Sequence, residues 1–165
     1  MIAVALGANL ESKAGAPSAT LRAALAALQE NGVRIVAVSP FYRTPAWPDP
    51  RDPDYVNAVA SVATTLGPRE LLAELERTET RFGRKRSVKN APRTIDLDIV
   101  DYDGRIEEGP PVLPHPRMRD RAFVLVPLAD VAPGWRHPVT GESVENLIAA
   151  LSADARAGVE KIGGS

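Results

Sequence analysis

Residues 95–99 of the chain, Ile-Asp-Leu-Asp-Ile, alternate strictly between apolar and acidic side chains. Alternate side chains of a β-strand share a face, so Asp96 and Asp98 point to one side of a sheet and the apolar residues to the other. Two carboxylates this close repel one another and are costly to hide from water. The pattern therefore predicts a strand whose apolar face is buried and whose acidic face is neutralised by metal ions or by nearby arginines.

The segments around this strand predict a mixed α/β (α+β) fold. Strand patterns occupy residues 2–7, 33–42, 55–66 and 95–102, and helical patterns begin near Pro17 and Pro68. The resulting order is strand, helix, strand, strand, helix, strand. This βαββαβ order favours a ferredoxin-like core, in which an antiparallel sheet carries two helices packed on one face.

The remaining residues are expected to form a C-terminal extension of this core. They contain a second proline-rich loop, a short helix near residues 118–121, an apolar segment at 123–128 and a closing helix around 144–151. The first proline-rich loop, residues 43–54, is interpreted as ordered because periodic segments resume on both sides of it. The length predicts a single domain over residues 1–165, with the last dozen residues frayed.

Composition excludes several classes of protein. A net charge of −1 argues against a surface built for nucleic acid or for an anionic membrane. The absence of cysteine excludes a disulfide framework, a thiolate nucleophile and a cysteine zinc site, and two histidines argue against a histidine-rich metal site. The apolar start is too short for a signal peptide and no run approaches membrane-spanning length, which predicts a cytoplasmic protein.

A run of basic residues precedes the acidic strand. Between residues 81 and 93 there is no acid, and the cations are Arg81, Arg84, Lys85, Arg86, Lys89 and Arg93. Taken alone, such a run is either a phosphate-binding segment or a solvated surface loop. Beside Asp96 and Asp98 it indicates a phosphoryl-transfer site for a nucleoside triphosphate and magnesium. The sequence has no Walker A motif and no G-x-G-x-x-G, so side chains would have to build that site.

A second group of candidate ligand contacts lies around residues 114–123. His115 stands between two prolines, which restrains its backbone and favours a role facing a ligand. Arg119 or Arg121 could reach phosphates, whereas Arg117 is expected to face solvent. Phe123 is either a ring that stacks on a planar ligand or part of the core.

Three residues earlier in the chain are further candidate ligand contacts. Tyr55 could stack on a planar ring or pack in the core, and Asn57 could pair with a ligand edge that offers a donor and an acceptor. Trp47 either anchors the proline-rich loop or covers a pocket.

Six ordered segments give the chain a resemblance to the 6-hydroxymethyl-7,8-dihydropterin pyrophosphokinase family. They are residues 7–10, 41–45, 54–58, 79–84, 92–98 and 114–123. The run Pro-Arg-Thr-Ile-Asp-Leu-Asp at residues 92–98 is similar to the signature of this family, and the matches extend over roughly residues 2–128. The resemblance implies an enzyme of folate biosynthesis that moves pyrophosphate from ATP to a pterin alcohol.

The resemblance also implies roles for individual residues. Asp96 and Asp98 would hold two magnesium ions, and the catalytic residues would be Arg84, Arg93, Asp96 and Asp98. The nucleotide would contact Glu79, Arg84, Arg86, Lys89, Arg93, Ile99, His115 and Arg121. The pterin would contact Thr44, Pro45, Trp47, Tyr55, Asn57 and Phe123. The partners would be ATP and the pterin, with no nucleic acid and no membrane, and the chain would act as a monomer.

The chain departs from well-known members of the family at two places, and two other classes of protein compete with the resemblance. Residues 89–91 are Lys-Asn-Ala where many members carry Arg-Trp-Gly, and Pro116 replaces a tyrosine found in some members.

A phosphoesterase or glycosyltransferase would explain the acidic pair but would give no role to the aromatic and amide residues. A non-enzymatic RNA-binding module would need exposed aromatic residues on its central strands, whereas residues 2–7 contain none.

Overall fold

The computed structural model describes residues 1–46, 49–84 and 94–162 of the chain. The elements in order are β1 (Ile2–Ala8), α1 (Pro17–Glu30), β2 (Arg34–Val38), β3 (Tyr42–Thr44), β4 (Tyr55–Ala63), α2 (Pro68–Arg81), β5 (Asp96–Tyr102), the 3-10 helix η1 (Met118–Asp120), α3 (Ala122–Val131), α4 (Val144–Ala149), α5 (Ala153–Ala157) and β6 (Glu160–Lys161). Within these described ranges, no helix is both long enough and apolar enough to cross a membrane.

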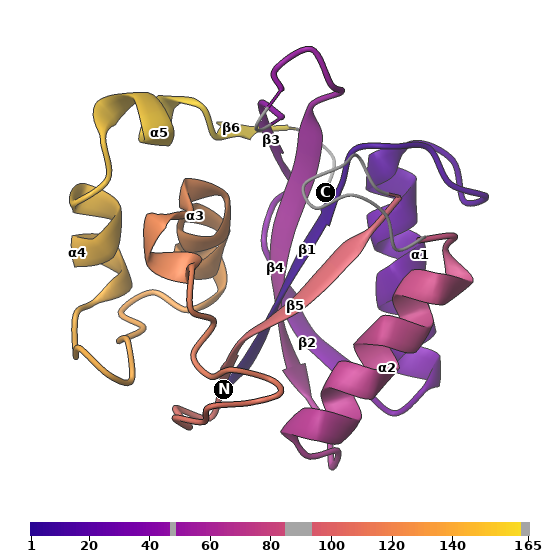
Figure 1. The fold of residues 1–165 in the computed structure, drawn as a ribbon, viewed down its shortest axis with the longest axis horizontal. Coiled ribbons are helices and arrows are strands. Elements are labelled where there is room, and N and C mark those ends of the chain that lie inside the picture. The colour runs from indigo at the N-terminus through magenta and orange to yellow at the C-terminus, as the bar shows by residue number, and fades with distance from the viewer. Residues whose placement is uncertain (47–48, 85–93, 163–165) are drawn as a thin grey trace.

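The strands form one antiparallel sheet in the order β5-β1-β4-β3-β6, and β2 also pairs with β4 (Figure 1). Strands β2 and β3 occupy successive parts of the same side of β4. The expected βαββαβ core and its antiparallel sheet are therefore confirmed, with the second strand divided in two.

Helices cover both faces of the sheet (Figure 1). Helices α1 and α2 lie on one face, where Val4 and Leu6 of β1 contribute to the main hydrophobic core. Helices α3 and α4 lie on the opposite face, over a second core to which Ala3 of β1 belongs. The two helices expected on one face are thus present, and the C-terminal extension buries much of the other face.

The strand predicted over residues 33–42 is interrupted between β2 and β3. Pro40 has no N–H to donate to a strand ladder, which disfavours continuous pairing at this point. The Ser39 hydroxyl accepts the backbone N–H of Val59 at 3.0 Å and so satisfies a β4 donor where the strand breaks. The expectation that a loop begins at residue 43 was also wrong, because Arg43 and Thr44 belong to β3.

The end of the chain has regular structure where the sequence predicted fraying. Helix α5 begins at a Ser152 cap, whose hydroxyl accepts the Ala155 N–H at 3.1 Å. Strand β6 follows and pairs with the outer edge of β3, with Lys161 opposite Tyr42. A strand edge offers unpaired donors and acceptors, so even a two-residue segment gains from pairing with it. Residues 163–165 lie outside the described ranges.

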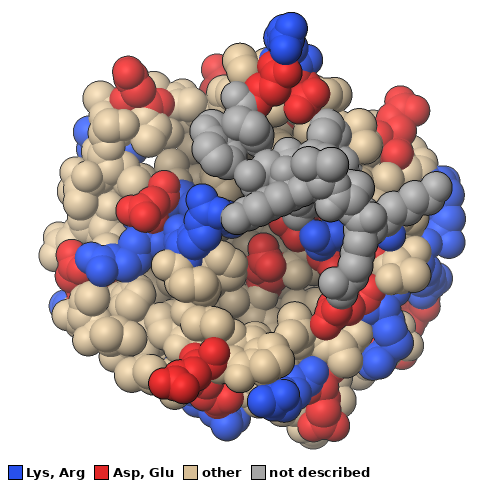
Figure 2. Space-filling model, viewed as in Figure 1, with Lys and Arg blue, Asp and Glu red and all other residues tan. Residues whose placement is uncertain are grey.

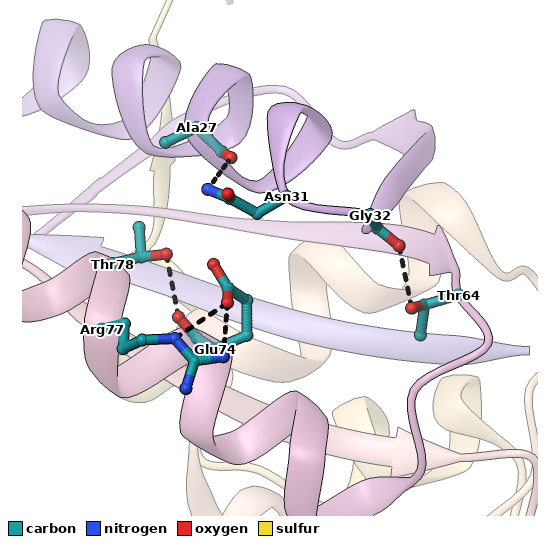
Figure 3. Close-up of polar contacts among 7 residues, drawn as sticks. All are labelled: Ala27, Asn31, Gly32, Thr64, Glu74, Arg77 and Thr78. Atoms are coloured by element: carbon teal, nitrogen blue, oxygen red, sulfur yellow. Dashed lines mark hydrogen bonds and ion pairs between the residues drawn. The ribbon is translucent and has the colours of Figure 1, made fainter.

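Polar contacts stabilise helices α1 and α2 and the segments next to them (Figure 3). The Asn31 amide donates to the Ala27 carbonyl at 2.8 Å at the end of α1, and the Thr64 hydroxyl donates to the Gly32 carbonyl at 2.9 Å. On α2, the Arg77 guanidinium donates to the buried Glu74 carboxylate at 2.6 Å. The Asn31 contact satisfies a carbonyl that the end of α1 leaves without a partner within the helix, and the Thr64 contact links the residue after β4 to the turn after α1.

Candidate active site

A cavity of about 320 Å³ opens on the sheet face that carries α3. It is lined by parts of β1, β4 and β5, by the end of β3, and by residues of the segment 115–124. Figure 2 shows a hollow near the centre of one face of the molecule, with acidic atoms within it and basic side chains at its edge. The candidate residues that line the cavity are Thr44, Pro45, Tyr55, Asn57, Asp96, Asp98, His115, Arg121 and Phe123.

Cross-strand register explains why the acidic pair and the amide share this cavity. Gly7 on β1 lies opposite Asn57 on β4 and opposite Asp96 on β5, and Ala5 lies opposite Asp98. The central strand therefore presents small residues between the carboxylates and the amide. Because two strand spacings separate β5 from β4, the backbones of Asp96 and Asn57 are roughly 10 Å apart. Because Gly7 and Ala5 of β1 carry little or no side chain, the space between the two flanking strands is open to a ligand.

A hydrogen bond holds the amide of Asn57 in the wall of the cavity. Its Nδ2 donates to the Thr44 hydroxyl at 2.7 Å, and both side chains are buried. Tyr55 and Phe123 also line the cavity, so the described structure brings together the rings and the amide expected to recognise a planar ligand.

Arg84 joins the acidic strand to the end of α2. Its Nη1 donates to Asp96 Oδ1 at 2.9 Å and also to Glu79 Oε2. The same Glu79 oxygen accepts the Leu97 backbone N–H at 2.8 Å. An arginine thus provides part of the neutralisation that the paired aspartates require, as the sequence predicted.

Glu79 acts on this arginine from a buried position. Burial raises the pKa of the Glu79 carboxyl to about 7, although the Leu97 N–H and the Arg84 charge oppose the shift. The residue is only 7% exposed and does not line the cavity. The contacts of Glu79 therefore place it behind Arg84, where the sequence predicted a nucleotide contact.

Ile99 occupies the face opposite to the acidic pair. Its side chain is 3% exposed and belongs to the main core under α1 and α2. Alternation along β5 produces this placement, so a nucleotide could reach only the backbone of Ile99, not its side chain.

His115 is fixed beside β5. Its backbone N–H donates to the Val100 carbonyl at 2.9 Å, and its Nδ1 accepts the Arg117 N–H at 3.2 Å. Burial lowers the pKa of His115, and the positive charges of Arg121 and Arg117 lower it further. A neutral imidazole that accepts at Nδ1 carries its proton on Nε2, so His115 can offer one donor to an anionic ligand.

The arginines of the 115–123 segment divide between two environments. Arg119 donates to Glu142 at 2.9 Å and does not line the cavity, whereas Arg121 lines it and stacks over the Phe123 ring at 5.5 Å. Arg117 and Asp120 also line the cavity, and Arg117 is exposed, as expected. Their i, i+3 spacing places them on one side of a 3-10 turn.

Four candidate residues lie outside the described ranges. These are Trp47, Arg86, Lys89 and Arg93.

The acidic pair fits a magnesium site. Asp96 and Asp98 share one sheet face at the cavity, and the described residues include no group of three or more His, Asp or Glu side chains arranged to hold a metal alone. Magnesium keeps several waters and is bound through one or two carboxylates together with substrate phosphates. A pair of carboxylates in an open cavity beside arginines is therefore a suitable donor set.

Paired carboxylates, adjacent arginines and a ring-lined cavity on an antiparallel sheet together define a metal-assisted phosphoryl-transfer enzyme. Residues 3–133 match the family model for 7,8-dihydro-6-hydroxymethylpterin-pyrophosphokinase (HPPK). The chain belongs to this family.

Curated relatives are similar over most of the chain. A Pseudomonas aeruginosa protein is 39% identical over 164 residues, which cover 98% of this chain and 96% of the relative. A Methylorubrum extorquens protein is 38% identical over 159 residues, covering 95% of each. A Synechocystis protein is 41% identical over 125 residues, which are 75% of this chain and 64% of that relative. All three are named 2-amino-4-hydroxy-6-hydroxymethyldihydropteridine pyrophosphokinase.

Solved structures share the fold. An HPPK-DHPS crystal structure in complex with substrates matches with a TM-score of 0.68 and 14% identity, covering 90% of this chain and 42% of that one. A Plasmodium falciparum HPPK-DHPS triple mutant with pteroate matches with a TM-score of 0.71 and 12% identity, covering 98% and 46%. The chain thus spans less than half of these proteins, and the match confirms the ferredoxin-like fold.

Proposed function

We propose that the chain transfers the pyrophosphoryl group of ATP to the hydroxyl of 6-hydroxymethyl-7,8-dihydropterin, giving AMP and the pterin diphosphate, a reaction of folate biosynthesis. The observation that carries the proposal is one cavity that contains both Asp96 and Asp98 and the ring-binding residues Tyr55, Asn57 and Phe123. A site for phosphate chemistry alone would not need the second group.

In this reaction the hydroxymethyl oxygen forms a bond to the β-phosphorus of ATP. The bond from the β-phosphorus to the oxygen that bridges it to the α-phosphorus breaks, AMP leaves with that oxygen, and the hydroxyl proton passes to solvent. Such transfers depend on alignment of the two reactants and on neutralisation of phosphate charge. The shared floor of Gly7 and Ala5 lets both reactants lie over one sheet face.

Two magnesium ions held by Asp96 and Asp98 belong to the proposal. When bound, such ions neutralise phosphate charge and strengthen the hydroxymethyl oxygen as a nucleophile. Arg84 would bind the triphosphate from the side of α2, with Glu79 holding the guanidinium in place. The ion pair of Arg84 with Asp96 supports a position for Arg84 next to the proposed metal ligands. Arg93 would stabilise the charge that develops as AMP leaves.

On the nucleotide side, His115 would donate its Nε2 proton to a phosphate oxygen and Arg121 would supply positive charge. The cavity position of both side chains supports these roles. Arg86, Lys89 and the backbone of Ile99 complete the proposed nucleotide contacts.

On the pterin side, Tyr55 and Phe123 would enclose the ring and Asn57 would pair with its pyrimidine edge. Thr44 and Pro45 line the same end of the cavity. Trp47 would close this subsite from the proline-rich loop.

We also propose that residues 1–165 act as one domain and as a monomer in the cytoplasm. The two hydrophobic cores pack on opposite faces of one sheet and share strand β1, which supports a single domain. The absence of cysteine suits a reducing compartment.

The reaction is tested by incubating the purified chain with ATP, magnesium and 6-hydroxymethyl-7,8-dihydropterin, followed by chromatography of nucleotides and pterins. We expect AMP and the pterin diphosphate in equal amounts, and no AMP when the pterin is left out. Formation of ADP, or AMP that does not depend on the pterin, would contradict the proposal.

A further inference from the structure

Gly7 lies inside a strand where its backbone does not require glycine. Its φ angle lies outside the left-handed region, so any residue could adopt the same backbone conformation. Glycine in a strand interior weakens the strand, and it often marks a place where another group approaches closely. The reason for a glycine at position 7 must therefore be sought in the space above its Cα.

That space is occupied by two side chains of the ring-binding subsite. A Cβ atom on Gly7 would lie 2.8 Å from Oδ1 of Asn57 and 3.9 Å from Cδ1 of Tyr55. The first distance is shorter than Cβ atoms tolerate, while the second is an ordinary contact. The Asn57 amide oxygen thus sits in the position that a side chain on Gly7 would take.

The other end of the same amide is held by Thr44. The Nδ2 atom of Asn57 donates to the Thr44 hydroxyl at 2.7 Å, and the two residues are 5% and 6% exposed. Both ends of the amide are therefore placed by neighbouring residues. The oxygen fits in the space above Gly7 of β1, and the nitrogen is held by a buried hydrogen bond to Thr44 of β3. A buried side chain with both ends located has few rotamers left to it.

We propose that Gly7 and Thr44 are positioning residues that set the depth and plane of the Asn57 amide, and thereby determine how tightly the chain binds the pterin edge. The inference rests on the proposed function, because it assigns Asn57 to the pterin. Gly7 acts by leaving room for the amide oxygen, and Thr44 acts by accepting from the amide nitrogen. Neither contact involves the acidic pair, so the loss of either contact should affect pterin binding more than nucleotide binding.

The first test compares Thr44→Val, which removes the hydroxyl but keeps the branched shape, with Thr44→Ser, which keeps the hydroxyl. Calorimetry measures the affinity of each variant for 6-hydroxymethylpterin and, separately, for a nonhydrolysable ATP analogue with magnesium. We expect Thr44→Val to weaken pterin binding by about 5-fold to 10-fold, the effect of one lost hydrogen bond. Nucleotide affinity should change by less than about 2-fold, and Thr44→Ser should bind like wild type within the same margin.

The second test is a double-mutant cycle of Gly7→Ala with Asn57→Ala. If Gly7 acts through the amide, Gly7→Ala should weaken pterin binding about 10-fold when Asn57 is present and less than about 2-fold when it is absent. Equal effects in both backgrounds, or an equal loss of nucleotide affinity, would overturn the inference. Should Gly7→Ala not fold, the Thr44 pair decides alone, and wild-type pterin affinity in Thr44→Val would overturn it.

Failure of the proposed function gives a different result. A wild-type chain that binds the nucleotide analogue but no pterin would overturn the proposed function together with this inference. A wild-type chain that binds and converts the pterin, with variants that behave identically to it, would overturn the positioning role alone.

Discussion

The guanidinium of Arg84 donates to Asp96 at 2.9 Å and bridges this carboxylate to Glu79. One arginine thus links strand β5, which carries the acidic pair, to the end of α2 and offsets the charge of both acids. Removing it leaves the Glu79 side chain, which is 10% exposed, with the Leu97 N–H but no positive partner, which is costly in a poorly hydrated site.

Arg84→Ala is therefore expected to affect stability and activity together. We expect a loss of about 2 kcal/mol in the free energy of unfolding by urea. Turnover should fall by a factor on the order of 10² to 10³, because the proposed role of the arginine is to neutralise the triphosphate.

The matched control is Arg77→Ala, which removes an arginine that contacts the buried Glu74 on the same helix, away from the cavity (Figure 3). Arg77 also partners a buried carboxylate, so its loss should cost a similar free energy of unfolding, but Arg77 does not line the cavity and its loss should leave turnover unchanged. Equal effects of the two substitutions on turnover would remove the special role of Arg84.

The acidic pair gives the second prediction. Asp96→Asn and Asp98→Asn should each reduce turnover by a factor on the order of 10² to 10⁴, because a neutral amide does not hold magnesium against phosphate. Circular dichroism should show an intact fold. Asp103→Asn is the control, since Asp103 lies in the turn after β5, has a φ of 52° that asparagine tolerates, and does not line the cavity. Normal turnover in either cavity variant would exclude the metal role.

Stability should depend on the titration of Glu79. Burial raises the pKa of this carboxyl from 4.5 in the unfolded chain to about 7 in the fold. Between these two values the folded state binds the proton more tightly than the unfolded state. The free energy of unfolding should therefore fall as pH rises from about 5 to 7.5, by at most about 3 kcal/mol.

Glu79→Gln provides the comparison, because its amide does not titrate. Urea unfolding at a series of pH values should show the wild type losing stability relative to Glu79→Gln as pH rises through this window. Parallel curves for the two proteins would contradict a raised pKa at Glu79.

His115 should be neutral at physiological pH. Burial and the charge of Arg121 lower the pKa of its imidazole below the ordinary value of 6.5. Nitrogen-15 NMR, with the signals assigned by comparison with His115→Asn, should show the Nε2–H tautomer and a midpoint below 6.5. A midpoint above 6.5, or a proton on Nδ1, would contradict the donor role assigned to Nε2.

Much of the core could be predicted because local patterns agreed with tertiary contacts. The alternation around Asp96 and Asp98 is a property of the strand itself, so the shared face followed directly from the sequence. Pro17 and Pro68 both stand at the first position of a helix, where the missing N–H costs nothing. The ferredoxin-like fold followed from the order of such segments.

Other features depend on contacts between distant segments. The apolar run at residues 123–128 lies in helix α3, and an apolar segment of this length shows no period that separates a buried helix from a buried strand. Strand β6 exists because the outer edge of β3 is available to it, which local composition does not show. Residues 160–161, which lie in the segment predicted to fray, form a strand through this pairing.

In the candidate site, too, local features could be predicted from the sequence and contacts between distant segments could not. Residues that line the cavity from β4 and β5 were found because their chemistry is unusual for a strand. The hydrogen bond of Asn57 to Thr44 and the opposition of Gly7 to both Asn57 and Asp96 depend on strand register. Register is set by the pairing of strands, which here brings together residues 13, 50 and 89 positions apart, and a single sequence does not reveal it.

The central claim is that both terminal phosphates of ATP move together to the pterin. The most direct measurement uses ATP radiolabelled at the β-phosphorus, incubated with the chain, magnesium and 6-hydroxymethyl-7,8-dihydropterin, and follows where the label goes. The account predicts that all transferred label appears in the pterin product while the released AMP carries none. Label that stays in ADP, or appears as free pyrophosphate without a labelled pterin, would contradict it.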